Sequence, residues 1–279
     1  MNKIDSSETI RKTTLSFFNY KTINKKPQNT AFLSWFVGFT EGDGSFIVSH
    51  QRLFFIINQK DERVLYYIRT NLGFGKVSTY GNYSRYIVAD RKNCDRLIEL
   101  FNGNLLLHKT RERFKSWLCE RNRGSQDQKS FKNRDQPHSF QDDGWLSGFV
   151  DAEGSFNAQK ISDNRYTLSF RIRLRFILDQ KNELSLLLSI QDFLGTGHIG
   201  IRETNKRESG EINRLTCTHT QSHQKLVEYL KKYPLRTPKR TGFLRWKTLM
   251  NYIKNRSCLV WQGKVLNRVL FLVKNINKS

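Results

Sequence analysis

The chain has 279 residues, and Lys and Arg outnumber Asp and Glu 48 to 25, which leaves a formal charge of +23 at pH 7. Such an excess favours a polyanionic partner, nucleic acid first, while 37% hydrophobic residues can form a core and exclude a disordered basic tail. Four cysteines without a C-x-x-C pair exclude a disulfide framework and a zinc site and indicate a reducing compartment, and no apolar run reaches the roughly 18 residues of a membrane span.

Residues 1–30 carry six Lys or Arg residues and two acids, and they lack the apolar run of a secretory signal. We interpret this segment as a basic N-terminal arm. An Arg-rich amphipathic transit sequence is the alternative interpretation.

The first half of the chain alternates helical and strand patterns. Leu33, Phe36 and Val37 recur at helical spacing, and Gly44 ends this first helix. The expected elements after it are strands 45–50 and 53–59, helix 61–72, a second hairpin turning at Gly81-Asn82, and helices 94–102 and 111–119. This order predicts an α+β domain of the pattern αββαββα over residues 31–119, with a four-stranded antiparallel sheet.

A polar segment separates this domain from a second one. Residues 120–143 contain no aliphatic side chain and are interpreted as a linker. The second domain, 144–279, repeats the order of elements and adds a C-terminal helix: a helix from Trp145, a strand at 166–178, a helix at 182–194, strands at 197–202 and 212–219, and helices at 224–232, 242–252 and 258–273.

An internal repeat supports two pseudosymmetric domains in tandem. WFVGFTEGDGSF at 35–46 recurs as WLSGFVDAEGSF at 145–156 with six of twelve positions identical, and RLFFIINQKDE from Arg52 pairs with RLRFILDQKNE from Arg173. Both copies later present Phe-x-x-Trp, ending at Trp117 and Trp246, which we assign to core packing.

One predicted strand alternates apolar residues with arginines. Because side chains along a strand point to opposite faces in turn, this alternation places three guanidinium groups on one face: Arg171, Arg173 and Arg175. Arg can pair bidentately with guanine or clamp a phosphate. The pattern favours a sheet surface that binds nucleic acid over an ordinary charged face.

Each copy of the repeat carries a glycine and then two acids separated by a small residue: Gly38, Glu41, Gly42 and Asp43, and Gly148, Asp151, Ala152 and Glu153. Small residues four apart share one helix face, so two such helices can approach closely and bring one acid from each half together. Carboxylate oxygens suit Mg²⁺. The alternative is that these acids only cap turns.

These duplicated motifs resemble the signature of the LAGLIDADG homing endonucleases in their single-chain, two-motif form, over roughly residues 33–255. The resemblance implies that the two motif helices pack through Gly38 and Gly148 at the domain interface, and that each sheet lies in the DNA major groove. It also implies that the penultimate acid of each motif, Asp43 or Glu153, binds the catalytic metal. Glu41 and Asp151 then take a more structural position. The backbone carbonyls of Gly42 and Ala152 are expected as further metal ligands.

The resemblance implies further site residues. A Gln at the end of the second strand matches Gln59 and Gln180, and a Lys after the second hairpin matches Lys109 and Lys239. Arg63 is a companion of Gln59, although the second copy has Leu184 at that point. Besides the three arginines of the strand, the expected DNA contacts come from Arg52, Arg63 and Arg85.

The implied function is a monomeric endonuclease that uses Mg²⁺ or Mn²⁺ to hydrolyse one phosphodiester in each strand of double-stranded DNA and so promotes intron mobility. A long asymmetric site is expected because the two sheets differ. The main alternative is a maturase that binds intron RNA and assists group I splicing, with or without cleavage. The third is a DNA-binding regulator. The resemblance and the Lys, Asn, Ile and Phe richness favour an organelle genome, mitochondrial rather than chloroplast.

Overall fold

The computed structural model describes residues 13–23, 27–134, 136–202, 211–254 and 261–278. Within them the first half contains eight elements: α1 (Thr30–Asp43), β1 (Gly44–Ser49), β2 (Arg52–Gln59), α2 (Glu62–Leu72), β3 (Lys76–Tyr80), β4 (Tyr83–Val88), α3 (Arg91–Phe101) and α4 (His108–Asn122). The second half contains α5 (Trp145–Glu153), β5 (Ser155–Ser162), β6 (Phe170–Lys181), α6 (Leu184–Leu194), β7 (His198–Ile201), β8 (Ile212–Cys217), α7 (Thr220–Lys232), α8 (Lys239–Lys254) and α9 (Gly263–Asn275).

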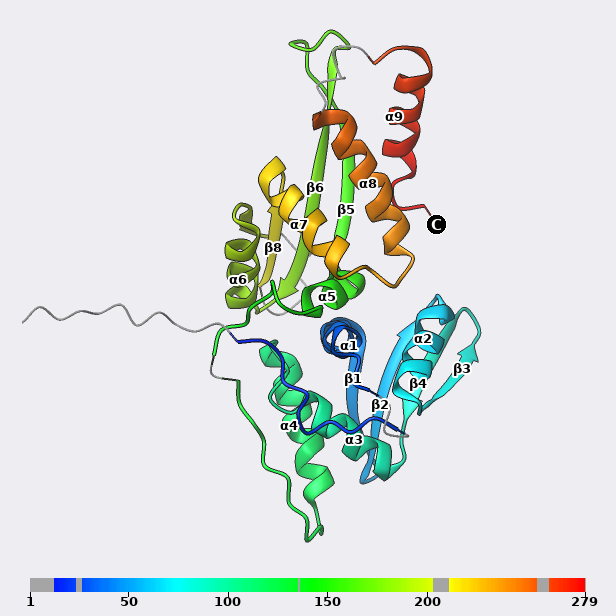
Figure 1. Ribbon diagram of the computed structural model, residues 1–279, viewed down its shortest axis with the longest axis vertical. Coiled ribbons are helices and arrows are strands. Elements are labelled where there is room, and N and C mark those ends of the chain that lie inside the picture. Colours follow the sequence, from blue (N-terminus) through cyan, green and yellow to red (C-terminus); the bar gives the residue numbers. More distant parts are fainter. Residues whose placement is uncertain (1–12, 24–26, 135, 203–210, 255–260, 279) are drawn as a thin grey trace, which may run out of the picture.

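Each half has one antiparallel sheet of four strands, in the orders β1-β2-β4-β3 and β5-β6-β8-β7. Figure 1 shows the two halves stacked along the long axis of the molecule, with α1 and α5 between them. The predicted α+β class and the pseudosymmetric order αββαββα are therefore confirmed.

Most differences from the predicted elements lie at their ends. α1 begins at Thr30 because the Asn29 side chain caps it, accepting a hydrogen bond from the Phe32 amide at 2.9 Å. The strand predicted at 166–178 begins only at Phe170, since hydrogen bonds between Asp163, Tyr166 and Ser169 close a turn before it. Residues 258–260 of the predicted C-terminal helix lie outside the described residues, and α9 begins at Gly263.

Aromatic side chains form matching cores beneath the two sheets. In the first half Phe46 lies with its ring centroid 5.3 Å from those of Phe114 and Trp117. In the second half Phe156 lies 5.3 Å from Phe243 and 5.5 Å from Trp246. Both tryptophans are fully buried, so they anchor α4 and α8 against the first strand of each sheet.

The two halves meet where α1 packs directly on α5. A Cβ atom added to Gly38 would overlap the Trp145 carbonyl oxygen, and one added to Gly148 would overlap the Trp35 carbonyl oxygen. Only glycine allows this approach of one backbone to the other. Each tryptophan also crosses the interface, since Trp35 Nε1 donates to Asp151 Oδ2 at 2.8 Å and Trp145 Nε1 donates to Glu41 Oε2 at 2.6 Å.

The described part of the segment expected as a basic arm, residues 13–23, packs on the first half and on the linker. Leu15, Phe17 and Tyr20 are buried, and the Leu15 amide donates to Asp143. These apolar residues outweigh the local basic charge, so this stretch is part of the core. Residues 1–12 and 24–26 of the expected arm lie outside the described residues.

The polar segment between the halves is also packed. α4 extends to Asn122, and the buried Arg121 pairs with Asp95 at 2.7 Å. Phe140 is buried, with its ring centroid 5.7 Å from that of Trp145. The segment therefore fixes α4 to the start of α5. Among the described helices, none has the length and apolarity needed to cross a membrane.

Candidate active site at the junction of the two halves

Asp43 and Glu153 are the last residues of α1 and α5, and the packing of these helices brings both carboxylates to one place. A Cβ atom on Gly42 would overlap the Ala152 side chain and would lie 3.4 Å from Glu153 Oε1. Gly42 and Ala152 are therefore in contact across the interface, and Glu153 extends over Gly42 toward the first half. The two acids predicted from the duplicated motif are brought together, one from each half.

The site disfavours two bare negative charges. Burial raises the pKa of Asp43, while the Gln59 amide, which donates to Asp43 Oδ2 at 2.7 Å, and the Lys239 charge oppose the rise. Burial also raises the pKa of Glu153, and the charge of Asp43 adds to that effect, whereas Lys239 and Lys109 lower it. A divalent cation held by these two residues would compensate both charges.

The other acid of each motif is fully engaged with backbone and indole donors. Glu41 Oε1 accepts hydrogen bonds from the amides of Leu106 and Leu107 at 2.8 and 2.7 Å. Burial raises its pKa to about 8, against the effect of these donors and of Trp145. The buried Asp151 likewise binds the segment that leads into α8, accepting the amides of Arg236 and Thr237 at 2.7 and 3.2 Å.

These structural acids thus hold the two segments that carry the expected lysines. Lys239 is at the start of α8, and its Nζ donates to the carbonyls of Val150 at 3.2 Å and Ala152 at 2.7 Å. The Ala152 carbonyl, expected as a metal ligand, is therefore already an acceptor of the Lys239 ammonium. Lys109, one residue into α4, is exposed and lies near enough to Glu153 for their charges to interact.

A cleft of about 240 Å³ opens beside Glu153. Its walls come from both halves and include Gly42, Lys109, Arg113, Glu153, Asp179 and Gln180. The predicted Gln180 thus lies in this cleft, whereas its counterpart Gln59 is bound to Asp43. Arg113 and Asp179 were not predicted as cleft residues, since nothing in the sequence alone places α4 of one half beside β6 of the other.

Within the described residues, no group of three or more His, Cys, Asp and Glu side chains could hold a metal ion. Asp43 and Glu153 offer two hard carboxylates, one from each half. Magnesium commonly binds through one or two carboxylates and fills its other positions with water and phosphate oxygens. The donor set therefore fits Mg²⁺ or Mn²⁺ together with a nucleic-acid backbone.

The predicted arginine face is present on β6. Phe170, Ile172, Leu174 and Phe176 are buried, and the three arginines between them point to the opposite, partly exposed face. Polar partners hold two of them, since Arg173 binds Gln159 at 3.0 Å and Arg175 binds Asn157 at 3.0 Å. Arg171 pairs with Asp163 at 3.2 Å.

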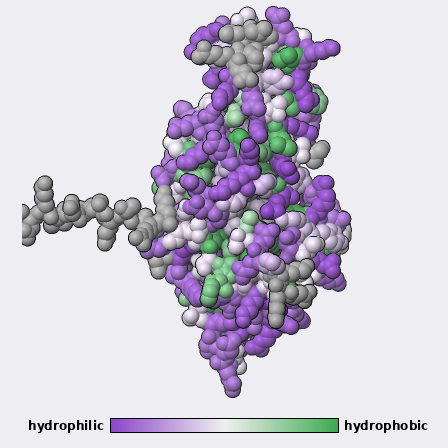
Figure 2. Space-filling model, viewed as in Figure 1, coloured by the Kyte–Doolittle hydropathy of each residue, from purple (hydrophilic) through white to green (hydrophobic). Residues whose placement is uncertain are grey.

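The other expected DNA contacts are arginines of the first half. Arg52 is exposed over the Phe54 ring, and Arg85 lies on the sheet beside Asn58. Arg63 forms its ion pair with Asp61, the cap of its own helix, at 2.7 Å. Figure 2, viewed as Figure 1, shows that hydrophilic side chains cover most of the visible surface, with apolar groups in small separate areas.

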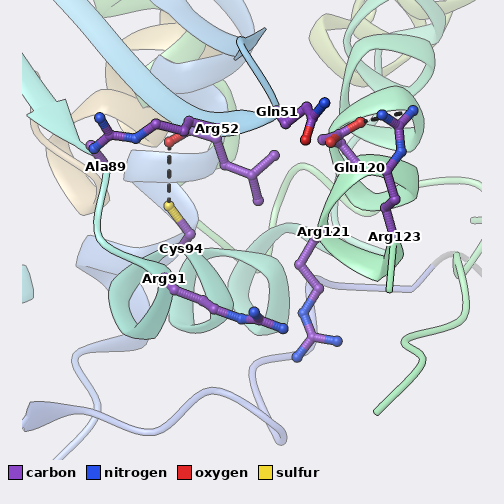
Figure 3. A pocket seen from close by; sticks show the side chains of 9 residues that line it. Gln51, Arg52, Ala89, Arg91, Cys94, Glu120, Arg121 and Arg123 are labelled. Atoms are coloured by element: carbon purple, nitrogen blue, oxygen red, sulfur yellow. Dashed lines mark hydrogen bonds and ion pairs between the residues drawn. The ribbon is translucent and has the colours of Figure 1, made fainter. Parts of the chain in front are cut away.

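A second cleft, of about 350 Å³, lies between the β1–β2 turn and the ends of α3 and α4 (Figure 3). Four arginines line it, and acids pair with two of them: Arg123 pairs with Glu120 at 3.2 Å, and Arg121 pairs with Asp95. The buried Cys94 thiol faces the Leu53 carbonyl. This cleft lacks the paired carboxylates of the junction, which remains the candidate site.

The tryptophans that cross the interface were assigned no role from the sequence. Trp35 and Trp145 occupy the first position of each repeated motif, and the presence of tryptophan in both copies was the only sequence feature that could have indicated a role. Their indole groups tie each structural acid to the opposite half.

Comparisons with known proteins agree with this architecture. The family model described as LAGLIDADG endonuclease matches residues 36–120 and 146–250. The chain is 34% identical over 261 residues to "Probable intron-encoded endonuclease 4" of Neurospora crassa, covering 89% of this chain but only 45% of that protein. It is 28% identical over 276 residues to "Uncharacterized cox1 intron-2 37.2 kDa protein" of Schizosaccharomyces pombe, covering 92% and 78% of the two chains.

Solved structures share the fold at low sequence identity. The meganuclease I-SmaMI bound to uncleaveable DNA superimposes with a TM-score of 0.68 at 19% identity, over 88% of this chain and 99% of that one. This likeness extends through both halves and their junction.

Proposed function

This chain belongs to the LAGLIDADG endonuclease family, and we propose that it is a site-specific endonuclease that cuts both strands of a long, asymmetric DNA site with divalent metal. The observation that carries the proposal is the convergence of Asp43 and Glu153 at the ends of α1 and α5. A protein that only bound DNA would have no need of two partly buried carboxylates amid a charge of +23.

Asp43 and Glu153 are the residues that would hold Mg²⁺ or Mn²⁺, which when bound supplies Lewis-acid chemistry for phosphodiester hydrolysis. Gln59 fixes the orientation of the Asp43 carboxylate through its 2.7 Å hydrogen bond. Lys239 holds the carbonyls at the end of α5 and so fixes the backbone that carries Glu153. Gln180 and Lys109 line the cleft beside Glu153, where they position solvent and the phosphate.

The substrate surface consists of the outer faces of the two sheets. Arg171, Arg173 and Arg175 supply cations to the second half, and Arg52 and Arg85 supply them to the first. The two sets differ in number and spacing, which supports an asymmetric target. Since one chain provides both halves, it acts as a monomer. If about ten phosphates are contacted, affinity falls roughly 10³- to 10⁵-fold between 50 and 200 mM salt.

The same proposal extends to the biological role. Cleavage of an intronless allele promotes intron mobility, and we place the encoding gene in an organelle genome, a mitochondrial one rather than a chloroplast one. The similarity to a protein named for a cox1 intron supports an intronic origin.

The test is cleavage of DNA that spans the intronless insertion site, with Mg²⁺ present, by the wild type and by Asp43→Asn and Glu153→Gln. We expect the wild type to cut both strands, and the two variants to bind the same DNA without cutting it. Cutting by either variant at the wild-type rate would contradict the proposal. If the wild type leaves the DNA intact and promotes splicing of the precursor RNA, the chain is a maturase.

A further inference from the structure

The two sheets differ at one pair of matching positions close to the candidate active site. In the first sheet Asn58 on β2 lies opposite Arg85 on β4, and in the second Asp179 on β6 lies opposite Arg214 on β8. Asn58 and Asp179 each come one residue before the expected glutamines, on the outer face of the sheet. The first half therefore has an amide where the second half has a carboxylate.

In the first half the arginine has neutral partners. Arg85 Nε donates to Asn58 Oδ1 at 2.8 Å, and the guanidinium lies over the Tyr80 ring, 5.0 Å from its centroid. Tyr83 lies beside it, with its ring centroid 5.8 Å from the guanidinium carbon. No carboxylate of the described residues forms an ion pair with Arg85, so its whole charge is available to an incoming phosphate or base.

In the second half the carboxylate occupies two arginines. Arg214 binds Asp179 in a bidentate manner, with Nε to Oδ1 at 2.7 Å and the terminal nitrogen to Oδ2 at 2.6 Å. Arg202, at the position that matches Tyr80, adds a contact to Asp179 Oδ2 at 3.3 Å. All three side chains are partly exposed on the face that carries Arg175.

We propose that Asp179 is a specificity-determining residue, which occupies Arg214 and Arg202 until a correct base edge replaces it. This inference rests on the proposed DNA endonuclease function. A bidentate carboxylate uses the same donors that Arg presents to a phosphate or to guanine O6 and N7. The negative charge also repels a phosphate that approaches without a matching base, which is a means of rejecting wrong sites. A partly exposed ion pair is weak enough for a specific contact to displace it.

The matched variants are Asp179→Asn, which gives the second half the amide of the first, and Asn58→Asp, which does the reverse. Each is measured for equilibrium binding to two duplexes, one recovered by cleavage from a randomised library and one of equal length with scrambled sequence. Binding is measured in EDTA, because Asp179 also lines the cleft beside Glu153.

We expect Asp179→Asn to gain one phosphate contact and so to bind the scrambled duplex roughly eightfold more tightly at 0.1 M salt. The slope of log affinity against log salt concentration should become more negative by about 0.9. Its affinity for the recovered duplex changes less, so the ratio of recovered-duplex affinity to scrambled-duplex affinity falls. Asn58→Asp weakens scrambled binding by a similar factor, because the new carboxylate occupies Arg85.

The outcomes separate the two proposals. If the wild type cleaves no duplex of the library, or binds neither duplex, the proposed function fails. If the wild type binds and both variants keep its affinity for the scrambled duplex, the role of Asp179 is overturned while the proposed function stands. Should Asp179→Asn fail to fold, Asn58→Asp decides alone, because its effect arises in the other half.

Discussion

The two halves share their framework and differ in how they hold the two acids that we propose bind metal, Asp43 and Glu153. Asp43 is fixed by Gln59 at 2.7 Å, whereas Glu153, longer by one methylene, extends across Gly42 into a cleft with Lys109 and Gln180. Each half makes the same two kinds of contact across the junction. A glycine lies against a tryptophan carbonyl of the other half, and a tryptophan indole donates to an acid of the other half. The two halves are therefore nearly symmetric in their contacts with each other and differ around Asp43 and Glu153.

The largest expected effect is a loss of stability when the close packing of α1 on α5 is disrupted. Gly38→Val and Gly148→Val each place side-chain atoms on a backbone carbonyl of the other half. We expect each to lower the free energy of unfolding by about 3 kcal/mol or more, and by similar amounts, since overpacking at a rigid backbone cannot relax locally. Urea unfolding followed by circular dichroism measures the loss. Ala31→Val, at an exposed position of α1, is the control.

Tolerance of either valine at a cost under about 1 kcal/mol would show that the helices can separate without loss of packing. A large loss of unfolding free energy in only one of the two variants would show that the halves contribute unequally to the stability of the junction, although their contacts are similar.

The next effect distinguishes the two tryptophans. Trp145→Phe leaves Glu41 Oε2 with no remaining donor among the described residues, while Trp35→Phe leaves Asp151 with the two amides and the hydroxyl of residues 236–237. We expect losses of about 2 and about 1 kcal/mol respectively, because a buried carboxyl oxygen left without a donor costs more than an acid that keeps donors on both oxygens. Thermal unfolding of both variants, with Phe39→Leu as a packing control, gives the comparison. Equal losses would assign the whole effect to ring packing.

Much of this architecture could be predicted from the sequence because it depends on local patterns that occur twice. The period of two along β6 identified the buried and exposed faces, and the repeated motif identified Asp43 and Glu153. What could not be predicted depends on contacts between distant segments. Leu15 binds Asp143 across 128 residues, and Lys109 and Asp179 share a cleft only because α4 and β6 meet at the junction. Basic charge in residues 1–30 also obscured the apolar side chains that bury residues 13–23.

A smaller effect concerns the two glutamines. Gln59→Ala removes the hydrogen bond that orients Asp43, and we expect the rate of cleavage to fall about tenfold, as for other residues that orient a metal-binding carboxylate. Gln180→Ala removes a cleft residue without such a bond to Glu153, so its rate should fall less. Single-turnover nicking of each strand at saturating Mg²⁺, together with binding in EDTA, measures both. Equal losses of nicking rate in the same strand for both variants would contradict the expectation that Gln59 contributes more than Gln180.

The smallest effect concerns a buried position that differs between the halves. The repeat aligns Cys94 of α3 with His223 of α7, whose ring lies 4.6 Å from that of Trp246 and donates from Nε2 to the Cys217 carbonyl at 3.0 Å. Burial lowers the pKa of His223, with a smaller contribution from His219, and the Cys217 bond opposes this.

Because the folded state then binds fewer protons than the unfolded state, the contribution of His223 to stability is present above the unfolded pKa of about 6.5 and is lost as pH falls below it, by at most about 1.4 kcal/mol per pH unit. His223→Cys introduces the residue of the first half, and we expect it to flatten the dependence of unfolding free energy on pH between 7 and 5. His198→Gln, at an exposed strand position, is the control. If the unfolding free energy of His223→Cys depends on pH as strongly as that of the wild type, the pH dependence arises from other groups. The exchange of Cys94 for His223 between the halves then makes no contribution to it.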